Sequence, residues 1–572
     1  MSNLDTSATG VRLALLEAGL LSGELGSDAF IRAAVALGAD KVAMRAEKLL
    51  AISANQARLR ASLQASYDYI VVGSGAAGAV VARRLAENPN LHVLLLEAGE
   101  TDLESNMLVT ESWFMAQGTE VDWNFAAEPS TALDGRSIRH AAGRALGGST
   151  SINGMIWARG HRRDYDEWAA ITGDAAWGYD NILSIYKRIE DWHGAQDDAR
   201  RGSGGPVFVQ SAPDPHPMAH DLLRAAADIG IPTFDSQNGL LEESDGGAAI
   251  SSVRLRNGRR LNIPADYLYP VMDQPNLTVL TGASVTRVLI AEGVATGVEF
   301  DWQGQRRQIG ASAEIVLSAG ALNTPRILML SGVGDRGELQ RHGIALAAHV
   351  PGVGQNFQDH PIIGAGLWQA PTAVVPRNNS AEANLFVKSR AGLDRPDLHI
   401  WHVEGPYLSE ATGRFATENV WSISPGLVRP VSRGQIRLRS ADPYAPPVIQ
   451  SNMLAAPEDM QALREGMRIS RALGNSPHMA RHVSREILPG AREGQALDEL
   501  IRAGAMSMHH PTSTAAMGRD DLAVVDAQLR VRDVKRLRIA DASIMPTITT
   551  GNTQAPSVII GERLAQMLHQ PR

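Results

Sequence analysis

The sequence has no cysteine at any of its 572 positions. This absence excludes disulfide bonds, cysteine-ligated zinc, iron–sulfur clusters, covalently attached c-type haem and a thiolate nucleophile. It also means that the redox state of the compartment leaves no mark on the sequence. Long hydrophobic runs are missing too, and without a stretch of about 18 apolar residues a membrane-spanning helix is not expected.

An excess of positive charge is also missing. Lys and Arg number 54 against 62 Asp and Glu, a net charge of −8, so the sequence lacks the basic footprint of a nucleic-acid-binding protein. Residues 1–10 carry an Asp and no Lys or Arg, unlike the basic start of a secretory signal. Hydrophobic residues at 44% and charged residues at 20% are typical of a globular chain, and 61.3 kDa suggests two to four domains. We therefore expect a cytoplasmic protein without a nucleic-acid partner.

Residues 1–65 predict a helical N-terminal extension. Glycines divide it into short pieces at Gly23, Gly26 and Gly38. Its last piece carries an apolar stripe at helical spacing, interrupted by Arg45 and Gln56. The stripe consists of Val42, Leu49, Ile52, Leu59 and Leu63. We expect the stripe to pack against the main body of the protein, with docking of a partner as the alternative.

A change of pattern at Tyr67 marks the start of a nucleotide-binding unit. Residues 67–72 predict a buried strand, residues 76–87 a helix and residues 92–96 a second strand that ends at Glu97. The turn between the first strand and the helix reads GSGAAG. Strand, glycine turn, helix and strand form a βαβ unit, so we predict a doubly wound α/β fold.

Each of the three glycines of this turn, Gly73, Gly75 and Gly78, is expected for a different structural reason. The first permits a tight turn, the second lets a pyrophosphate approach the backbone, and the third lets helix and strand pack closely. Glu97 lies 19 residues past Gly78, where an acid accepts hydrogen bonds from an adenosine ribose and disfavours the 2′-phosphate of NADP. The motif predicts that the protein binds a dinucleotide, but it does not distinguish FAD from NAD.

Four further segments resemble one family. They are GRALGGSTSING at 143–154, GALNTPR at 320–326 with SGVG at 331–334, PGVGQNFQDH at 351–360, and LRIADASIMPTITTGNTQAPSVIIGE at 537–562. Together with GSGAAG, they are similar to the motifs of the glucose–methanol–choline (GMC) oxidoreductases, which are FAD enzymes. The resemblance covers about residues 67–570 and leaves the first 65 outside it.

The resemblance implies FAD as the cofactor and a set of residues that hold it. Some relatives attach the flavin covalently through a histidine at the position of Ile152, and an isoleucine cannot form that bond, so we expect non-covalent FAD. The implied cofactor-binding residues are Gly73, Gly75, Ala76, Ala77, Gly78, Glu97, Ala98, Arg144, Gly147, Gly148, Asn153, Gly154, Val285, Asp541, Ala542 and Thr553. No metal ligands are expected.

The segment 508–514, MHHPTST, resembles the family's catalytic H-P-x-x-T segment and places His510 in the catalytic position. Asn552 matches the second active-site position, which holds His or Asn in the family. An imidazole suits the removal of a hydroxyl proton, and a carboxamide can stabilise the developing alkoxide without titrating. His509 is expected as a polar wall of the site, with support of His510 as the alternative.

Residues of the strand-like segment LHIWHVEG fall where relatives line the substrate pocket. His402 and Glu404 alternate and so point to one face, either into the pocket or to solvent. Trp157 and Trp401 could form aromatic walls, although large apolar residues more often belong to the core.

These observations predict an FAD-dependent oxidation of an alcohol, a primary one and aryl or furanic by preference, with choline-like or sugar-like polyols next. A hydroxynitrile lyase or a light-driven fatty acid decarboxylase on the same fold is the alternative. The expected partners are the alcohol and either dioxygen or another electron acceptor; oxidase or dehydrogenase activity and homo-oligomer formation stay open. We expect an FAD-binding domain over 66–365, with segments of the substrate domain interleaved in it. A substrate-binding domain on a mainly antiparallel sheet is expected over 366–505, and a C-terminal return that carries the catalytic pair over 506–572.

Overall fold

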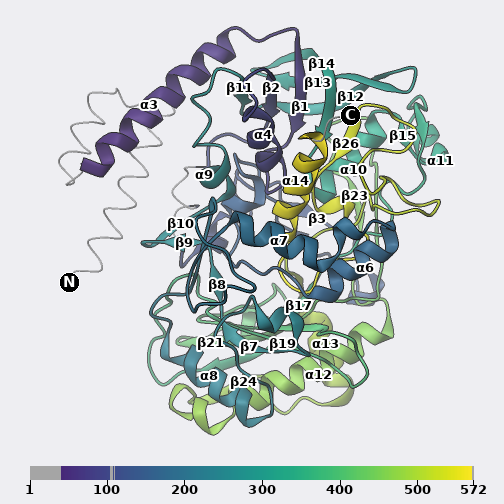
Figure 1. Ribbon diagram of the computed structural model, residues 1–572. Coiled ribbons are helices and arrows are strands. Elements are labelled where there is room, and N and C mark those ends of the chain that lie inside the picture. Colours follow the sequence, from purple (N-terminus) through teal and green to yellow (C-terminus); the bar gives the residue numbers. More distant parts are fainter. Residues whose placement is uncertain (1–39, 103–106, 108–109, 570–572) are drawn as a thin grey trace.

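The computed structural model describes residues 40–102, 107 and 110–569. Two β-sheets lie at opposite ends of the molecule, with helices and loops between them (Figure 1). The chain crosses between the two ends several times before its last helix returns to the first sheet. This α/β architecture confirms the predicted fold class.

The first sheet has seven strands in the order β11-β2-β1-β14-β13-β12, with β26 also paired to β14. Pairing is parallel among β11, β2, β1, β14 and β26, whereas β12, β13 and β14 form an antiparallel meander. The strands are β1 (Ser66–Val72), β2 (Val93–Leu96), β11 (Leu277–Leu280), β12 (Ser284–Ala291), β13 (Val294–Trp302), β14 (Gln305–Leu317) and β26 (Leu537–Ile539). The parallel part is the doubly wound core that the βαβ pattern predicted.

The glycine turn follows β1 and opens helix α4 (Gly78–Ala86), two residues later than predicted. Gly73 has φ +99°, and a Cβ there would lie 2.3 Å from the carbonyl oxygen of Ser318. A Cβ on Gly78 would lie 1.9 Å from the carbonyl oxygen of Gly73. The first glycine therefore permits the turn and the third permits the close helix–strand contact, because any side chain at either position would overlap backbone atoms.

The second sheet has eight strands, and all of its pairs are antiparallel. Its strands are β7 (Gly247–Ile250), β17 (Pro361–Ile363), β18 (Leu367–Gln369), β19 (Ala383–Val387), β20 (Leu398–Val403), β21 (Val420–Leu427), β24 (Arg485–Leu488) and β25 (Ala505–Ser507). Two of them precede residue 366 and one ends at residue 507, so the sheet draws on chain from all three of the predicted segments. The domain boundaries themselves stay a prediction.

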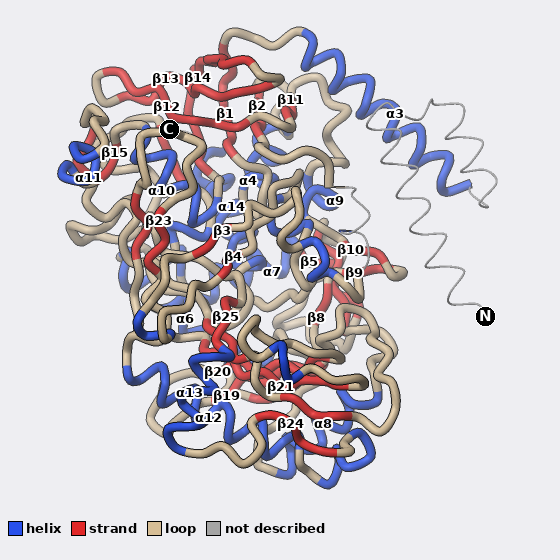
Figure 2. Tube along the Cα trace, turned by 180° about the vertical axis from the view of Figure 1, so that it is seen from behind, coloured by secondary structure: helices blue, strands red, loops and turns tan. Residues whose placement is uncertain are grey.

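Helices α8 (Pro217–Asp228), α12 (Pro457–Gly474) and α13 (Gly494–Gly504) lie around the second sheet (Figure 2). Within the described residues, the other α-helices are α3 (Asp40–Ala61), α6 (Arg162–Thr172), α7 (Tyr179–Ile189), α9 (Ile263–Tyr267), α10 (Gly320–Leu330), α11 (Arg336–Arg341) and α14 (Gln554–His569). Short strands complete the fold: β3 (Phe125–Ala126), β4 (Arg139–His140), β5 (Glu190–His193), β6 (Val207–Ser211), β8 (Ser252–Val253), β9 (Leu255–Arg256), β10 (Arg259–Arg260), β15 (Val333–Gly334), β16 (Ala348–His349), β22 (Gln435–Arg437) and β23 (Val448–Gln450).

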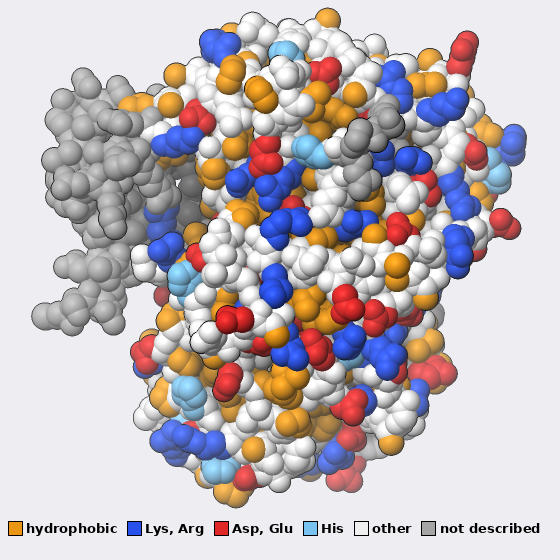
Figure 3. Space-filling model, in the orientation of Figure 1, with side chains coloured by type: hydrophobic (Ala, Val, Ile, Leu, Met, Phe, Trp, Pro, Cys, Tyr) orange, Lys and Arg blue, Asp and Glu red, His pale blue; other side chains and the backbone are white. Residues whose placement is uncertain are grey.

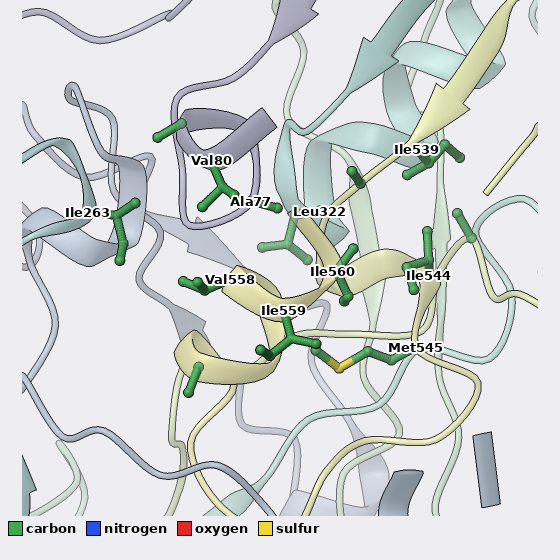
Figure 4. Packing of buried hydrophobic residues seen from close by; sticks show 14 of the residues in the cluster. Ala77, Val80, Ile263, Leu322, Ile539, Ile544, Met545, Val558, Ile559 and Ile560 are labelled. Carbon is green, nitrogen blue, oxygen red and sulfur yellow. The ribbon is translucent and has the colours of Figure 1, made fainter. Parts of the chain in front are cut away.

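The last helix, α14, returns the C-terminal segment to the nucleotide-binding unit. It packs against α4 so closely that a Cβ on Gly561 would lie 2.7 Å from the carbonyl oxygen of Ala77. In Figure 4 its residues Val558, Ile559 and Ile560 lie among apolar side chains of α4, α10 and the segment after β26. This packing fixes the chain just before α14, where Asn552 lies.

Helix α3 packs against the main body through its apolar stripe. Leu49, Ile52 and Leu59 are buried, and Leu63 is half-buried against the core. Packing is thus confirmed for these residues. The side chains of Val42 and Arg45, and the glycines at 23, 26 and 38, lie outside the described residues.

Gln56 does not interrupt the contact made by α3, because its side chain is buried and bonded to the sheet. Its Nε2 donates to the carbonyl oxygens of Met272 (2.7 Å) and Leu277 (2.9 Å), and its Oε1 accepts from the N–H of Val279 (2.9 Å). A polar residue inside an apolar stripe is tolerated where both ends of its amide find partners.

On the face of the molecule in Figure 3, acidic and basic side chains are interspersed and apolar side chains are scattered between them. Over the described part of the chain, no helix combines the length and the apolar character needed to cross a membrane.

Candidate active site

A cavity of about 470 Å³ is lined by residues from both halves of the molecule. The glycine turn, the loop at 141–156 and the start of α10 form one part of its wall. Residues from β20, the segment 508–511 and the segment 552–554 form another part. The glycine turn and the motifs at 143–154, 320–326 and 537–562 therefore meet around one space, although they lie hundreds of residues apart, whereas residues 331–334 and 351–360 do not line it.

Most of the expected cofactor positions line this cavity. They are Gly73, Gly75, Ala76, Ala77, Glu97, Ala98, Arg144, Gly148, Asn153, Gly154, Val285, Asp541, Ala542 and Thr553. Gly78 and Gly147 do not line it. A Cβ on Gly147 would lie 2.5 Å from Ser151 Oγ and 2.8 Å from the ring of Pro264, so this glycine, like Gly78, is needed for packing behind the wall.

Two glycines of the cavity wall expose their backbone to open space, where a bound group could approach it. A Cβ on Gly75 or on Gly320 would have no atom within 4 Å, and both glycines line the cavity. Gly148 approaches the same turn, since its Cβ would lie 3.3 Å from Gly75 Cα. Open backbone of this kind at the start of a helix suits a phosphate that approaches N–H groups closely.

Glu97 lies at the carboxyl end of β2, and its carboxylate accepts three hydrogen bonds from neighbouring residues. Its Oε2 accepts from the N–H (2.9 Å) and the hydroxyl (2.6 Å) of Ser74, and its Oε1 accepts from the N–H of Gly99 (2.9 Å). Burial raises the pKa of Glu97 and these hydrogen bonds oppose the rise. The carboxylate is held rigidly at the cavity wall and could accept a further hydrogen bond from a sugar hydroxyl.

Asp541 ties the end of β26 to the start of α10. Its Oδ2 accepts from the N–H of Gly320 (3.0 Å) and the hydroxyl of Thr324 (2.6 Å), and its Oδ1 accepts from the N–H of Ser543 (2.8 Å). Asp541 and Ala542 both line the cavity, so this turn sets the position of the wall that α10 contributes.

His510 and Asn552 meet at the cavity. The Nδ2 atom of Asn552 lies 3.2 Å from Nε2 of His510, and both residues line the space. The Oδ1 atom of Asn552 is buried without a hydrogen-bond partner. On its other side, Nδ1 of His510 lies 3.0 Å from Nδ1 of His360.

These contacts fix the tautomer of His510. An amide NH₂ can only donate, so Nε2 of His510 accepts from Asn552 and carries no proton. The proton of the neutral ring then lies on Nδ1, which donates to Nδ1 of His360. The lone pair of Nε2 therefore accepts from Asn552, and both residues line the cavity.

Asp359 anchors both histidines through the backbone. Its Oδ1 accepts from the N–H groups of His360 (2.8 Å) and His510 (2.9 Å). Its Oδ2 accepts from the hydroxyl of Ser507 and lies 3.2 Å from Nδ1 of His140. Burial alone would raise the pKa of Asp359, but the contacts with His140, Ser507 and His510 outweigh it and hold the pKa well below its usual range.

Burial keeps the histidines of the site neutral. It lowers the pKa of His510 well below its ordinary value, and the neighbouring His360 adds to this effect while Asp359 opposes it. Burial also lowers the pKa of His360 to about 3 and that of His509 to about 4. A neutral imidazole at His510 is available to accept a proton at neutral pH.

His509 lines the cavity, and its backbone adopts a left-handed φ of +61°. Its Nδ1 accepts from the N–H of Ala141 at 2.9 Å, which couples it to the glycine-rich loop. No hydrogen bond between the side chains of His509 and His510 is present. The contact with Ala141 and the place in the wall agree with a wall residue.

The strand β20 corrects one expectation about the pocket. Trp401 lines the cavity, together with Tyr407 and Met508, whereas His402 and Glu404 are buried on the opposite side of the strand and do not line it. Both interpretations of His402 and Glu404, as pocket wall and as solvated face, are therefore wrong, because alternation places them together without saying which side faces the cavity. Trp157 is fully buried core, with Tyr186 edge-on at 6.4 Å.

Sequence reasoning missed Asp359, His360 and His140. The first two stand in the segment QDH, which carried the family resemblance, and an acid followed by a histidine there was the available signal. His140 lies in β4 outside every quoted motif, and only the fold brings it to Asp359.

Comparison with known proteins agrees with this geometry. Family models described as GMC oxidoreductase match residues 67–362 and 430–561. An uncharacterized GMC-type oxidoreductase of Mycobacterium tuberculosis is 39% identical over 530 residues, which is 88% of this chain and 99% of the relative. The alcohol dehydrogenase (acceptor) of Pseudomonas putida is 35% identical over 534 residues, covering 88% and 95% of the two chains.

Among solved structures, pyridoxine 4-oxidase from Mesorbium loti superimposes with a TM-score of 0.85 at 31% sequence identity. The match covers 88% of this chain and all of that one. The family match and the shared fold, with the glycine turn and the buried imidazole at one cavity, place the protein among the FAD-dependent oxidoreductases. The chain belongs to the GMC oxidoreductase family.

Proposed function

We propose that this enzyme oxidises a neutral primary alcohol, aromatic or furanic, to the aldehyde, with His510 as the general base and Asn552 as the hydrogen-bonding partner. The observation that carries this proposal is the contact of 3.2 Å between Asn552 Nδ2 and His510 Nε2 at the wall of the cavity. A substrate hydroxyl beside this pair could donate to Nε2 and accept from Nδ2, in place of their direct hydrogen bond.

In this mechanism His510 removes the hydroxyl proton and Asn552 stabilises the negative charge that develops on the oxygen. The bound FAD supplies the acceptor for the hydride from the substrate carbon. The ring of His510 is oriented by His360 and by Asp359, which bonds its backbone N–H. After proton transfer, the buried charge of Asp359 stabilises the imidazolium.

The cofactor would be held by the open backbone at Gly75 and Gly320, by Glu97 and by the loop at 143–154. Non-covalent attachment is supported by Ile152, which lines the cavity with a side chain that has no nucleophilic atom. Denaturing the purified protein with acid tests this, because non-covalent FAD passes into the supernatant. A yellow precipitate would contradict it.

The preference for a neutral substrate rests on the charges around the cavity. Among the described lining residues, the carboxylates are Glu97 and Asp541, and protein donors occupy the oxygens of both. A quaternary ammonium ion would find no free carboxylate there, while Trp401, Tyr407 and Met508 offer an apolar wall. Aromatic faces also attract cations, which makes choline the second candidate.

The experiment is anaerobic mixing of the enzyme with benzyl alcohol, furfuryl alcohol, choline and a sugar alcohol. The proposal expects loss of the visible flavin absorbance with the first two, and His510→Ala should slow this step by about 10²-fold or more. His220→Ala, a change of an exposed histidine, is the matched control. No bleaching with any alcohol would favour a lyase, and faster bleaching with choline would overturn the substrate class.

Admitting air tests the acceptor, because an oxidase returns the absorbance and forms hydrogen peroxide, whereas a dehydrogenase needs an added dye. The cytoplasmic location and a homo-oligomer stay predictions from the sequence.

A further inference from the structure

Arg326 is a buried cation whose charge is not paired. It lies on α10, is 7% exposed and lines the cavity. No ion pair or hydrogen bond involves its guanidinium among the described residues, and its Nε is buried without a partner. Burial lowers the pKa of Arg326 to about 10. An unpaired guanidinium inside a protein is costly, so a group that supplies negative charge is expected beside it.

A second arginine approaches the same place. The guanidinium carbon of Arg326 lies 5.8 Å from the ring centre of Trp123, and that of Arg144 lies 5.1 Å from the same ring. All three side chains belong to cavity-lining residues. Arg144 likewise has no ion pair within the part of the chain that the structure describes. Two cations held at one indole repel each other unless an anion lies near them.

The carboxylates that line the cavity do not pair with these arginines. Glu97 and Asp541 bond to neutral hydroxyl and backbone donors, and neither forms an ion pair with Arg326 or Arg144 among the described residues. Asp442 raises the pKa of Arg326 through its charge but is an exposed residue that forms no ion pair with it. Within the described part of the chain, the guanidinium of Arg326 is therefore left without a direct protein partner on the side that faces the cavity.

The same face of α10 also presents an acceptor. Asn323, three residues before Arg326, is 5% exposed, lines the cavity, and its Oδ1 is buried without a partner. An acceptor and a cation one helical turn apart match a ligand that carries both N–H or O–H donors and a negative charge. A nucleotide has both, whereas sulfate or chloride lacks the donors.

We propose that Arg326, together with Arg144, binds the diphosphate of FAD as a cationic pair outside the glycine fingerprint, and that Asn323 accepts a hydrogen bond from the adenosine half. This inference rests on the FAD of the proposed function and extends it to residues of α10. The glycine turn provides backbone N–H groups for the phosphates, and the arginines provide the countercharge that neutral N–H groups cannot.

The test follows the release of FAD from the diluted holoenzyme by the fluorescence of free flavin, over a series of KCl concentrations. Arg326→Met should raise the dissociation constant of FAD by roughly 10- to 100-fold, as expected for the loss of a hydrogen-bonded charge pair. Its affinity should also depend less on salt than that of the wild type, because one charge contact is gone. Arg326→Lys, which keeps the charge, should fall between the two.

Arg563→Met is the matched control. Arg563 also has a buried, unpartnered Nε and lies 5.5 Å from the ring of Trp177, but it does not line the cavity. Its variant should release FAD like the wild type. Equal release from both methionine variants would overturn the proposal, and so would weaker binding in Arg326→Met with an unchanged salt dependence, since that would show a packing effect on Trp123.

Competition identifies the anion. Because FAD and ADP both carry the diphosphate, Arg326→Met should weaken both and leave the ADP concentration that displaces FAD nearly unchanged. Adenosine lacks the diphosphate, so it should displace FAD from the variant at a lower concentration than from the wild type. If inorganic phosphate displaced FAD as well as ADP does, the pair would be a general anion site and the assignment to the nucleotide would be wrong.

The measurement involves no turnover, so an enzyme that binds FAD without oxidising alcohols still tests the proposal. If the wild type kept its flavin after denaturation, non-covalent binding would be refuted, and flavin content per purified chain would take the place of release. Equal content in Arg326→Met and Arg563→Met would then overturn the role of Arg326. Should Arg326→Met fail to fold, Arg326→Gln replaces it.

Discussion

The Nδ1 atoms of His360 and His510 lie 3.0 Å apart, with both rings buried and nearly perpendicular at 85°. One of the two nitrogens must carry the proton of this hydrogen bond, and the contact of Asn552 with Nε2 assigns it to His510. His360 therefore positions the base without touching the cavity, since it is not one of the lining residues.

We expect His360→Leu to reduce kcat while leaving KM for the alcohol nearly unchanged. Without its acceptor, the ring of His510 can rotate or exchange tautomers, and the loss should fall between about 10-fold and the roughly 10⁴-fold seen when a catalytic histidine holds the wrong tautomer. Steady-state kinetics against His360→Asn, which can still accept a hydrogen bond, checks this. A rise in KM alone would assign His360 to substrate binding.

The pH dependence of kcat/KM should follow the lowered pKa of His510. The base is active when neutral, and burial moves its pKa below the ordinary value of about 6.5. We therefore expect a plateau through neutral and alkaline pH and a fall only on the acid side. An activity that climbs with pH above about 7.5 would mean that His510 is protonated at neutral pH in the working enzyme.

Asp359→Asn should destabilise the protein by about 2–4 kcal/mol at neutral pH, because a buried carboxylate with three hydrogen-bond donors and the ring of His140 beside it is replaced by a group that fits only some of them. The folded pKa of Asp359 is depressed, so its contribution is present above the unfolded value of about 3.9 and is lost as the pH falls. Thermal denaturation at several pH values should show the variant and the wild type converging in acid.

Asp245→Asn is the control for Asp359. Its carboxylate is 91% exposed in a surface pair with Lys388, and such solvent-screened pairs contribute little to stability. A loss as large as that of Asp359→Asn would mean that the assay does not separate buried from exposed charges.

Glu404→Gln should be as stable as the wild type or more stable at neutral and alkaline pH. Burial and the neighbouring Glu382 raise the pKa of Glu404 to about 10, so the folded protein keeps this group protonated while the unfolded chain ionises it near 4.5. Wild-type stability therefore falls as the pH rises between these two values, and glutamine removes that dependence. Melting temperatures that favour the wild type at pH 8 would contradict a neutral Glu404.

The nucleotide-binding unit could be predicted from the sequence because its signals are local. The strand before Gly73, the glycine turn and the strand ending at Glu97 lie within about 30 residues, and the backbone at Gly73 and Gly78 admits no side chain. The start of α4 was placed two residues early, since turn residues can continue a helical pattern.

The surroundings of His510 could not be predicted in the same way. His140 and Asp359 come together from segments more than 200 residues apart, and nothing in either segment names the other. His402 shows a second limit, because the period of a strand says which residues share a face and leaves open which sheet neighbour or cavity that face meets. The pocket wall at Trp401 thus depended on the packing of the whole second sheet.

The hydrogen bonds of Gln56 to Leu277 and Val279 bear on whether another chain can pair with the edge of the parallel sheet. Strand β11 is the outermost strand of the parallel sheet, and its free hydrogen-bonding groups would offer a template on which another chain could add. Gln56 occupies the N–H of Val279 and the carbonyl of Leu277, and Arg60 occupies the carbonyl of Val279 at 2.8 Å. Helix α3 lies outside the family resemblance. Its side chains occupy backbone groups at the edge of β11 to which an additional strand would otherwise hydrogen-bond, and the carboxamide of Gln56 does so with the same donor and acceptor as a peptide group.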